Sequence, residues 1–174
     1  MKRVLVVTPK FAPCGGADSR RAEQLVPRFE SLGWSVDILA AHCNSTDAER
    51  PGVHRIRKPR LTAPGWRSPG LRSLGAFDRA ASALYSHRAF DLVLFSNTDF
   101  ASWRLGPRWL RRWNVPFVLD WQDPWFTTYY EQHPAIVPPG GRVKFAIANS
   151  LARRWEAMVA PAAAGHLFVS DAYD

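Results

Sequence analysis

The sequence predicts an α/β fold, a doubly wound Rossmann-like domain with a mainly parallel sheet. Short continuous apolar runs such as "VLVVT" (residues 4–8) and "DLVLFS" (residues 91–96) are typical of strands buried on both faces. These runs alternate with amphipathic segments of helical period, as βαβ units require. The 174 residues can enclose one substantial core, so we expect a single domain over residues 1–174.

Six apolar segments predict the strands. The first and fourth are rich in Val and Leu, which suits the centre of a parallel sheet. In "VPFVLD", Pro116 is tolerable because it lies near the start of the strand. The predicted strands are residues 4–8, 35–40, 53–57, 91–96, 115–120 and 166–170.

The first predicted helix covers residues 20–32. Leu25, Val26 and Phe29 recur at helical spacing, and Gly33 follows as a stop signal. Pro27 lies inside the segment, so we expect it to kink the helix or to set a boundary within it.

Pro- and Gly-rich segments separate the later elements. Residues 58–73 contain three Pro and two Gly without periodicity, which predicts a mobile basic loop. Residues 136–141 have the composition of a turn. The remaining helices are expected over residues 74–88, 100–113 and 142–159.

The formal net charge is +8, and the positive charges are clustered. Seven Lys or Arg and no acid lie between residues 50 and 77, and a second acid-free run covers residues 100–119. Such an excess favours polyanionic partners: phosphorylated substrates, anionic lipid or nucleic acid. The alternative is that these side chains are simply solvated. No nucleic-acid-binding motif is present, so we expect no nucleic-acid partner.

The Cys and His residues predict no metal site. Cys14 and Cys43 form neither a ligand spacing nor a disulfide framework, which suits a reducing cytoplasmic setting. The five His show no metal-binding spacing. No apolar run is long enough to span a membrane, although attachment to its surface remains open.

Ligands of doubly wound sheets bind beyond the carboxyl ends of the strands, so the polar residues that follow strands are candidates. In "PCGGADSRR", Gly15 and Gly16 precede a helix start without forming a dinucleotide fingerprint or a P-loop. Backbone N–H groups there could hold a phosphate, assisted by Arg20 and Arg21. The alternative is a plain turn with Asp18 or Ser19 as helix cap.

Two carboxylates, Asp120 and Asp123, leave the fifth predicted strand in "LDWQDPWFTTYY", beside Gln122 and Trp125. A carboxylate flanked by aromatic rings suits a general base, because desolvation raises its pKa. The alternative for at least one of the two is to cap the following turn.

The segment "FSNTDF" places Asn97 and Thr98 after the fourth predicted strand. These side chains could line a ligand cleft. They could instead cap the helix that is expected to begin near residue 100, which is the favoured interpretation.

The order of three segments, "KRVLVVTPKFAPCGGADSRRAEQLVPRFESLGWSVDILA", "DLVLFSNTDFASWRLG" and "VPFVLDWQDPW", resembles the N-terminal, acceptor-side domain of GT-B glycosyltransferases of the family 4 type. The resemblance extends from residue 2 to about residue 170. It implies one half of a GT-B fold, with glycosyl transfer from a nucleotide-sugar to an acceptor hydroxyl, retaining and without a metal or other cofactor.

The resemblance also implies roles for individual residues. Gly15, Gly16 and Arg20 match the loop that faces the donor diphosphate, and Asp123 matches the Asp of a "D-P-W" pattern, with Asp120 as the second catalytic candidate. Gln122 stands where the family has Arg or His. Acceptor contacts are expected from four residues: Gln122, Trp125, Asn97 and Thr98.

The donor-binding C-terminal domain of the family has no counterpart in these residues, so the isolated chain is expected to be inactive. The missing half is either a further domain or a partner subunit. A second interpretation is a non-catalytic binding subunit that recruits a partner chain at the membrane face. In both cases a sugar or lipid-linked acceptor is expected, at the cytoplasmic face of the membrane, where the loop over residues 58–73 could contact anionic lipid.

Overall fold

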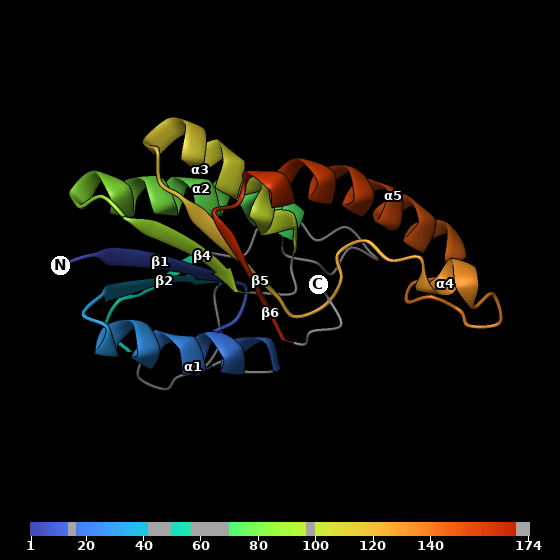
Figure 1. Ribbon diagram of the computed structural model, residues 1–174, viewed down its shortest axis with the longest axis horizontal. Coiled ribbons are helices and arrows are strands. Elements are labelled where there is room, and N and C mark those ends of the chain that lie inside the picture. Colours follow the sequence, from blue (N-terminus) through green and yellow to red (C-terminus); the bar gives the residue numbers. More distant parts are fainter. Residues whose placement is uncertain (14–16, 42–49, 57–69, 97–99, 170–174) are drawn as a thin grey trace.

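The sheet contains six strands whose neighbouring pairs are all parallel, and helices lie on both of its faces (Figure 1). The computed structural model describes residues 1–13, 17–41, 50–56, 70–96 and 100–169. The strands are β1 (Arg3–Thr8), β2 (Ser35–Ala41), β3 (Val53–Ile56), β4 (Leu92–Ser96), β5 (Phe117–Trp121) and β6 (Gly165–Phe168). The helices are α1 (Ala17–Ser31), α2 (Gly70–His87), α3 (Leu105–Trp113), α4 (Tyr129–Gln132) and α5 (Arg142–Val159), with short 3₁₀ helices η1 (Phe100–Arg104) and η2 (Ala160–Ala162).

The strand order is β3-β2-β1-β4-β5-β6, which confirms the predicted doubly wound sheet. The chain runs outward from β1 to β3 and then returns to the other side of β1, so the order reverses between β1 and β4. Ser96 at the end of β4 is in register with Asp120 of β5. The carboxyl ends of the central strands therefore meet at one edge, where ligands of such sheets bind.

Residues of β1 alternate between two cores. Val4 and Val6 pack in a cluster with α1, whereas Leu5 and Val7 belong to a cluster on the opposite face. All four side chains are fully buried, which explains why the strand is a continuous apolar run. Figure 1 shows α1 on one side of the sheet and α2, α3 and α5 on the other.

Helix α1 begins at Ala17, earlier than the predicted residue 20, and it does not end at Pro27. The first turn is already packed, since Ser19 is buried, while Pro27 faces solvent. The predicted stop at Gly33 is confirmed: its φ is +78°, and the N–H groups of Gly33 and Trp34 donate to the carbonyls of Glu30 and Phe29. This is a Schellman end, which requires a left-handed residue.

Two predicted boundaries were wrong. Helix α2 begins at Gly70, so the last part of the predicted loop is helical, and the buried Ser73 is packed within it; residues 58–69 lie outside the described residues. The helix expected over residues 100–113 is divided into η1 and α3. Pro107 has no N–H to donate to the carbonyl of Trp103, so the preceding turn is 3₁₀ rather than α. Helix α4, of four residues, was not predicted because it is too short to show a period.

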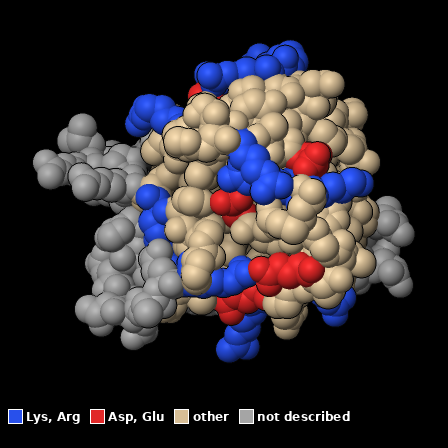
Figure 2. Space-filling view, turned by 90° about the vertical axis from the view of Figure 1, so that its left-hand side faces the viewer, with Lys and Arg blue, Asp and Glu red and all other residues tan. Residues whose placement is uncertain are grey.

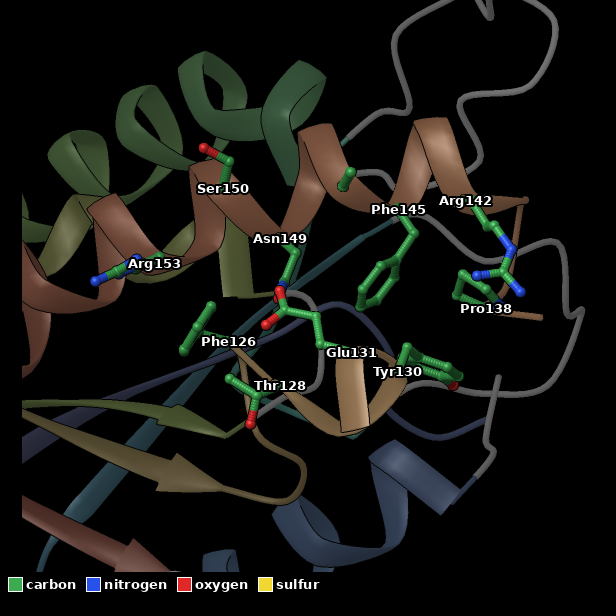
Figure 3. A pocket seen from close by; sticks show the side chains of 11 residues that line it. Phe126, Thr128, Tyr130, Glu131, Pro138, Arg142, Phe145, Asn149, Ser150 and Arg153 are labelled. Carbon is green, nitrogen blue, oxygen red and sulfur yellow. The ribbon is translucent and has the colours of Figure 1, made fainter. Parts of the chain in front are cut away.

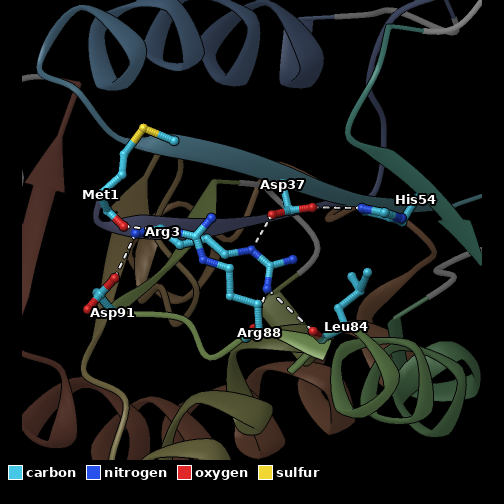
Figure 4. A network of polar contacts seen from close by, with 7 residues as sticks. All are labelled: Met1, Arg3, Asp37, His54, Leu84, Arg88 and Asp91. Carbon is cyan, nitrogen blue, oxygen red and sulfur yellow. Dashed lines mark hydrogen bonds and ion pairs between the residues drawn. The ribbon is translucent and has the colours of Figure 1, made fainter. Parts of the chain in front are cut away.

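A buried arginine joins the elements at the amino ends of the strands (Figure 4). Nε of Arg3 donates to Asp37 of β2 at 2.6 Å, and the other carboxylate oxygen of Asp37 lies 2.8 Å from Nε2 of His54 in β3. The backbone N–H of Arg3 donates to Asp91, and its guanidinium also donates to two carbonyls at the end of α2. Arg3 therefore connects three strands with α2.

The face at the amino ends of the strands mixes both charge signs. Figure 2 shows Lys and Arg interspersed with Asp and Glu over this side of the molecule. Over its described residues, this face does not present a continuous positive surface. Opposite charges lie near one another there, as Arg3 and Asp37 do in the network of Figure 4.

Candidate functional site

Five of the predicted site residues belong to the described part of the chain, and four do not. Arg20 lies in the first turn of α1, and the others lie at or after the end of β5: Asp120, Gln122, Asp123 and Trp125. Gly15, Gly16, Asn97 and Thr98 lie outside the described residues. The described candidates thus share the edge at which the strand order reverses.

Asp120 is fully buried and both of its carboxylate oxygens are engaged. Nε of Arg21 lies 2.7 and 2.9 Å from the two oxygens, and the hydroxyl of Ser96 donates to Oδ2 at 2.7 Å. Both oxygens of this carboxylate thus accept hydrogen bonds from neighbouring side chains. Its geometry suits positioning of the surrounding strands better than proton abstraction from a substrate.

The sequence interpretation gave Arg21 no role beyond that of a second cation beside Arg20. In the structure the two side chains diverge: Arg20 is exposed, whereas Arg21 turns toward the sheet and reaches Asp120. The signal is weak, because consecutive residues of a helix point about 100° apart and the sequence does not say which one faces the sheet.

Asp123 is the exposed carboxylate of the pair. The strand ends at Trp121, and Asp123 lies in the bend that follows, directly before Pro124. Unlike Asp120, it is accessible to a substrate placed above the carboxyl ends of the strands.

Gln122 lies between the two carboxylates and is half-buried. Its Nε2 atom is buried and has no hydrogen-bond partner within the described ranges. An unpaired buried donor is unfavourable, typically by about 1–3 kcal/mol, and is often found at functional sites. The Nε2 donor of Gln122 is therefore unused within the described ranges.

Trp125 belongs to an aromatic cluster beside this bend. Its ring stacks on Phe100 at 5.6 Å between centroids and meets Trp103 nearly edge-on at 5.7 Å. Trp121 also meets Trp103 nearly edge-on, at 4.7 Å between centroids. The cluster fixes the path of the chain after β5, so that Trp125 presents only part of its surface.

The first loop is held from β3. The guanidinium of Arg55 donates to the carbonyls of Phe11 and Ala12 at 3.1 and 2.6 Å, and to that of Ala41 at 3.1 Å. Arg55 was predicted only as one charge of a basic run. In the structure it orients the chain that leads into the Gly-rich segment.

Several other basic residues also contact partners within the protein. Arg50 pairs with Glu30, and Arg108 pairs with Asp78 at 3.0 Å. Arg104 lies over the ring of Trp155 at 4.4 Å. The excess positive charge is thus partly paired within the protein, while residues 57–69 of the basic segment lie outside the described part.

Two further features of the described residues bear on the predictions. They contain no group of three or more His, Cys, Asp or Glu side chains placed to share a metal ion. Within the same ranges, no helix has both the length and the apolar composition that a bilayer crossing requires.

Comparison with solved structures supports the GT-B assignment. The fold is similar to that of MurG from Acinetobacter baumannii, with a TM-score of 0.53 and 13% identity over 97% of this chain. The match covers 41% of the MurG chain, so this chain spans less than half of that protein. SsfS6, a glycosyltransferase of Streptomyces sp. SF2575, aligns with 69% of this chain and 39% of its own, at 17% identity and a TM-score of 0.41.

Sequence comparison gives the family. No curated protein matches the chain. The model of the glycosyl transferase 4-like domain matches residues 16–173, which is nearly the whole chain. The predicted N-terminal GT-B domain is thereby confirmed, and the chain belongs to the glycosyl transferase 4-like domain family.

Proposed function

We propose that the chain is the acceptor-binding half of a retaining, metal-independent glycosyltransferase that uses a nucleotide-sugar donor. Membership of the glycosyl transferase 4-like family supports glycosyl transfer in general. The observation that carries the finer assignment is the contrast between two neighbouring carboxylates: Asp120 is buried and paired, whereas Asp123 is exposed beside it.

In this proposal Asp123 orients or deprotonates the acceptor hydroxyl, and Asp120 is a positioning residue. Asp120 holds Arg21 and Ser96 and so fixes the end of β5 relative to β4 and α1. Gln122 contacts the acceptor in this proposal, and Trp125 forms an apolar wall. Asn97 and Thr98, which follow β4, contribute further acceptor contacts.

The loop with Gly15 and Gly16 binds the donor diphosphate in this proposal, together with Arg20. Two features of the described residues support this role. Arg55 draws the carbonyls of Phe11 and Ala12 toward β3, and a carbonyl held there does not face an anion. The α1 helix begins directly after the loop, so its positive N-terminal end lies beside it.

The donor-binding half comes from a further domain or from a partner subunit. The alignment to 41% of MurG supports this division, because a second half of comparable size remains unmatched. The nucleotide would then lie between the two halves, and no cofactor beyond the donor substrate is required.

The substitution Asp123→Asn tests the proposal in the complete enzyme, in which this chain is joined to its donor-binding half. General-base assistance is worth about 10²–10⁴-fold, so kcat should fall by that factor while the affinity for the donor stays unchanged. Glu30→Gln is the control, since Glu30 lies at the other end of α1. An unchanged kcat in Asp123→Asn would remove Asp123 from the mechanism.

A second candidate function is a non-catalytic subunit that recruits a catalytic partner at the cytoplasmic membrane face. The edge strand favours it, because Leu167, Phe168 and Val169 leave 37%, 36% and 45% of their surface exposed. Analytical ultracentrifugation with the downstream gene product should show a complex if this function is correct.

Peripheral membrane contact through the basic segment is a separate part of the proposal. Each Lys or Arg near an anionic surface contributes about 1 kcal/mol, so binding should be weak and salt-sensitive. Equal sedimentation with anionic and neutral liposomes at low salt would exclude it.

A further inference from the structure

A concave site lies between α4 and α5, beyond the carboxyl end of β5 (Figure 3). Its volume is about 520 Å³, within the range of roughly 300–1,000 Å³ that is typical of small-molecule sites. None of the site residues predicted from the sequence lines it. The residues used in the argument are Phe126, Thr128, Tyr130, Glu131, Phe145 and Arg153.

The wall of this pocket is held in place by partly buried hydrogen bonds. Asn149 of α5 is 7% exposed and pairs twice with Thr127: its Oδ1 accepts from the backbone N–H at 3.1 Å, and its Nδ2 donates to the carbonyl at 2.8 Å. Glu156 accepts from the N–H of Phe126 at 2.9 Å. The segment after β5 is thus fixed against α5, and these contacts hold the wall of the pocket.

The lining combines ring faces with groups that bind hydroxyls. Tyr130 and Phe145 contact each other at a centroid distance of 4.8 Å, and Phe126 lies farther along the wall. Thr128 and Glu131 add a hydroxyl and a carboxylate. Aromatic surface beside hydroxyl acceptors and donors suits a sugar ring, which has apolar C–H faces and a polar edge.

The pocket also carries positive charge at both ends. Figure 3 shows Arg153 at one end and Arg142 at the other, with the single carboxylate of Glu131 between them. The guanidinium of Arg142 already donates to a backbone carbonyl. Arg153 lies over the ring of Phe126 at 5.8 Å and has no acidic partner among the described residues. Its planar donors are therefore available for a carboxylate or phosphate.

We propose that the α4–α5 pocket binds an anionic sugar unit of the acceptor glycan, with its carboxylate or phosphate on Arg153. This inference rests on the proposed function and names the acceptor class for it. Phe126 of the lining is three residues from Asp123 in the chain, and the proposal has the next unit of the bound glycan reach Asp123. The pocket selects the acceptor, and Asp123 acts on the hydroxyl.

Calorimetric titration of the full chain tests this with three matched disaccharides: a neutral one, one that ends in a uronic acid, and one that carries a sugar phosphate. At least one anionic form should bind about tenfold more tightly than the neutral form, because a charge-assisted bidentate contact is added. Arg153→Gln should abolish this preference. Arg154→Gln, the adjacent helix position outside the pocket lining, should retain it. Phe145→Ala should weaken all three.

Whichever anionic form shows the preference identifies the charged group as carboxylate or phosphate. Equal affinity for charged and neutral disaccharides, no binding, or a preference that survives Arg153→Gln would each overturn the proposal. Full displacement of the disaccharide by inorganic phosphate would also overturn it, as an anion site without sugar recognition. In the complete enzyme, an unchanged rate of glycosyl transfer in Arg153→Gln would refute the role of the pocket but not the proposed transferase function. If the complete enzyme binds the saccharide in this pocket but transfers no sugar, only the proposed transferase function is refuted.

Discussion

Nε of Arg21 in α1 lies 2.7 and 2.9 Å from the two carboxylate oxygens of Asp120 at the end of β5. Strand β4 lies between β1 and β5, and its last residue, Ser96, donates to the same carboxylate. The link therefore spans the place where the strand order reverses and joins three elements there. It determines how the start of α1 sits relative to the bend that contains Asp123.

Removing Arg21 should destabilise the fold, because Asp120 would remain as an unpaired buried charge. We expect Arg21→Met to lower the free energy of unfolding by about 2–4 kcal/mol, less than the full effect of breaking a buried pair since Arg21 is 30% exposed. Urea denaturation measures this. Arg20→Met is the matched control and should change stability by less than about 0.5 kcal/mol.

A double-mutant cycle separates the ion pair from the loss of packing. The double substitution Arg21→Met with Asp120→Asn should be less destabilising than the sum of the two single substitutions, because the unpaired charge is gone. Strict additivity would show that the pair does not contribute as a pair.

Gly106 allows α3 to pack closely on β5. A Cβ at this position would lie 2.7 Å from ring atoms of the buried Phe117. We expect Gly106→Ala to lower stability by about 1–3 kcal/mol, and Phe117→Leu in the same chain to recover part of the loss. Thermal denaturation measures both.

Gly75 is the matched control for this substitution. It lies in α2 and is exposed, and a Cβ there would meet only the end of the Arg79 side chain at 3.5 Å. Gly75→Ala should stabilise the protein by about 0.5–1 kcal/mol through its higher helix propensity. A loss at Gly75 comparable to that at Gly106 would contradict the packing explanation.

Asp37 should make the free energy of unfolding decrease at acidic pH. Burial alone would raise the pKa of this carboxyl, but the hydrogen bonds and charges of Arg3 and His54 outweigh it, so its pKa lies below the ordinary value. The unfolded chain then takes up the proton first, and the stabilisation present above about pH 4 is lost as the pH falls through the lower folded pKa. Asp37→Asn should cost about 1–3 kcal/mol at pH 7, and this cost should shrink below pH 4. Denaturation at several pH values checks it; a cost independent of pH would refute the linkage.

Glu156 should show the opposite dependence. Burial raises the pKa of its carboxyl, and the hydrogen bond from the N–H of Phe126 offsets this only in part. Its contribution to stability is therefore complete below the unfolded pKa of about 4.3 and is lost as the pH rises through the folded pKa. Glu156→Gln keeps an oxygen for Phe126 and should match the parent near pH 3.

At pH 7, Glu156→Gln should be as stable as the parent or more stable by up to about 1 kcal/mol. In chemical denaturation experiments, the difference in stability between Glu156→Gln and the parent should grow from pH 3 to pH 7. Glu30→Gln, at an exposed ion pair with Arg50, should show no such trend. If Glu156→Gln instead loses stability relative to the parent as the pH rises, the raised pKa of Glu156 is contradicted.

The sequence alone determined the fold class and the edge of the sheet that holds the candidate residues. The alternation of buried strands such as residues 4–8 with amphipathic helices depends on local patterning, which each segment carries by itself. The stop at Gly33 was also predictable, since a left-handed helix end has a strong residue preference. The break before Pro107 could have been predicted from the missing N–H, whereas the four-residue α4 is too short to have a signal.

Only the tertiary structure decided which charged side chains form ion pairs and which remain exposed. Asp120 and Asp123 look alike in the sequence, and so do Arg20 and Arg21. In the structure Asp120 is buried in an ion pair with the half-buried Arg21, whereas Asp123 and Arg20 are exposed. The pocket between α4 and α5 likewise depends on how α5 packs on the segment after β5 through Asn149. Such pairings join residues far apart in the chain, and their geometry depends on helix rotation and strand register rather than on local composition.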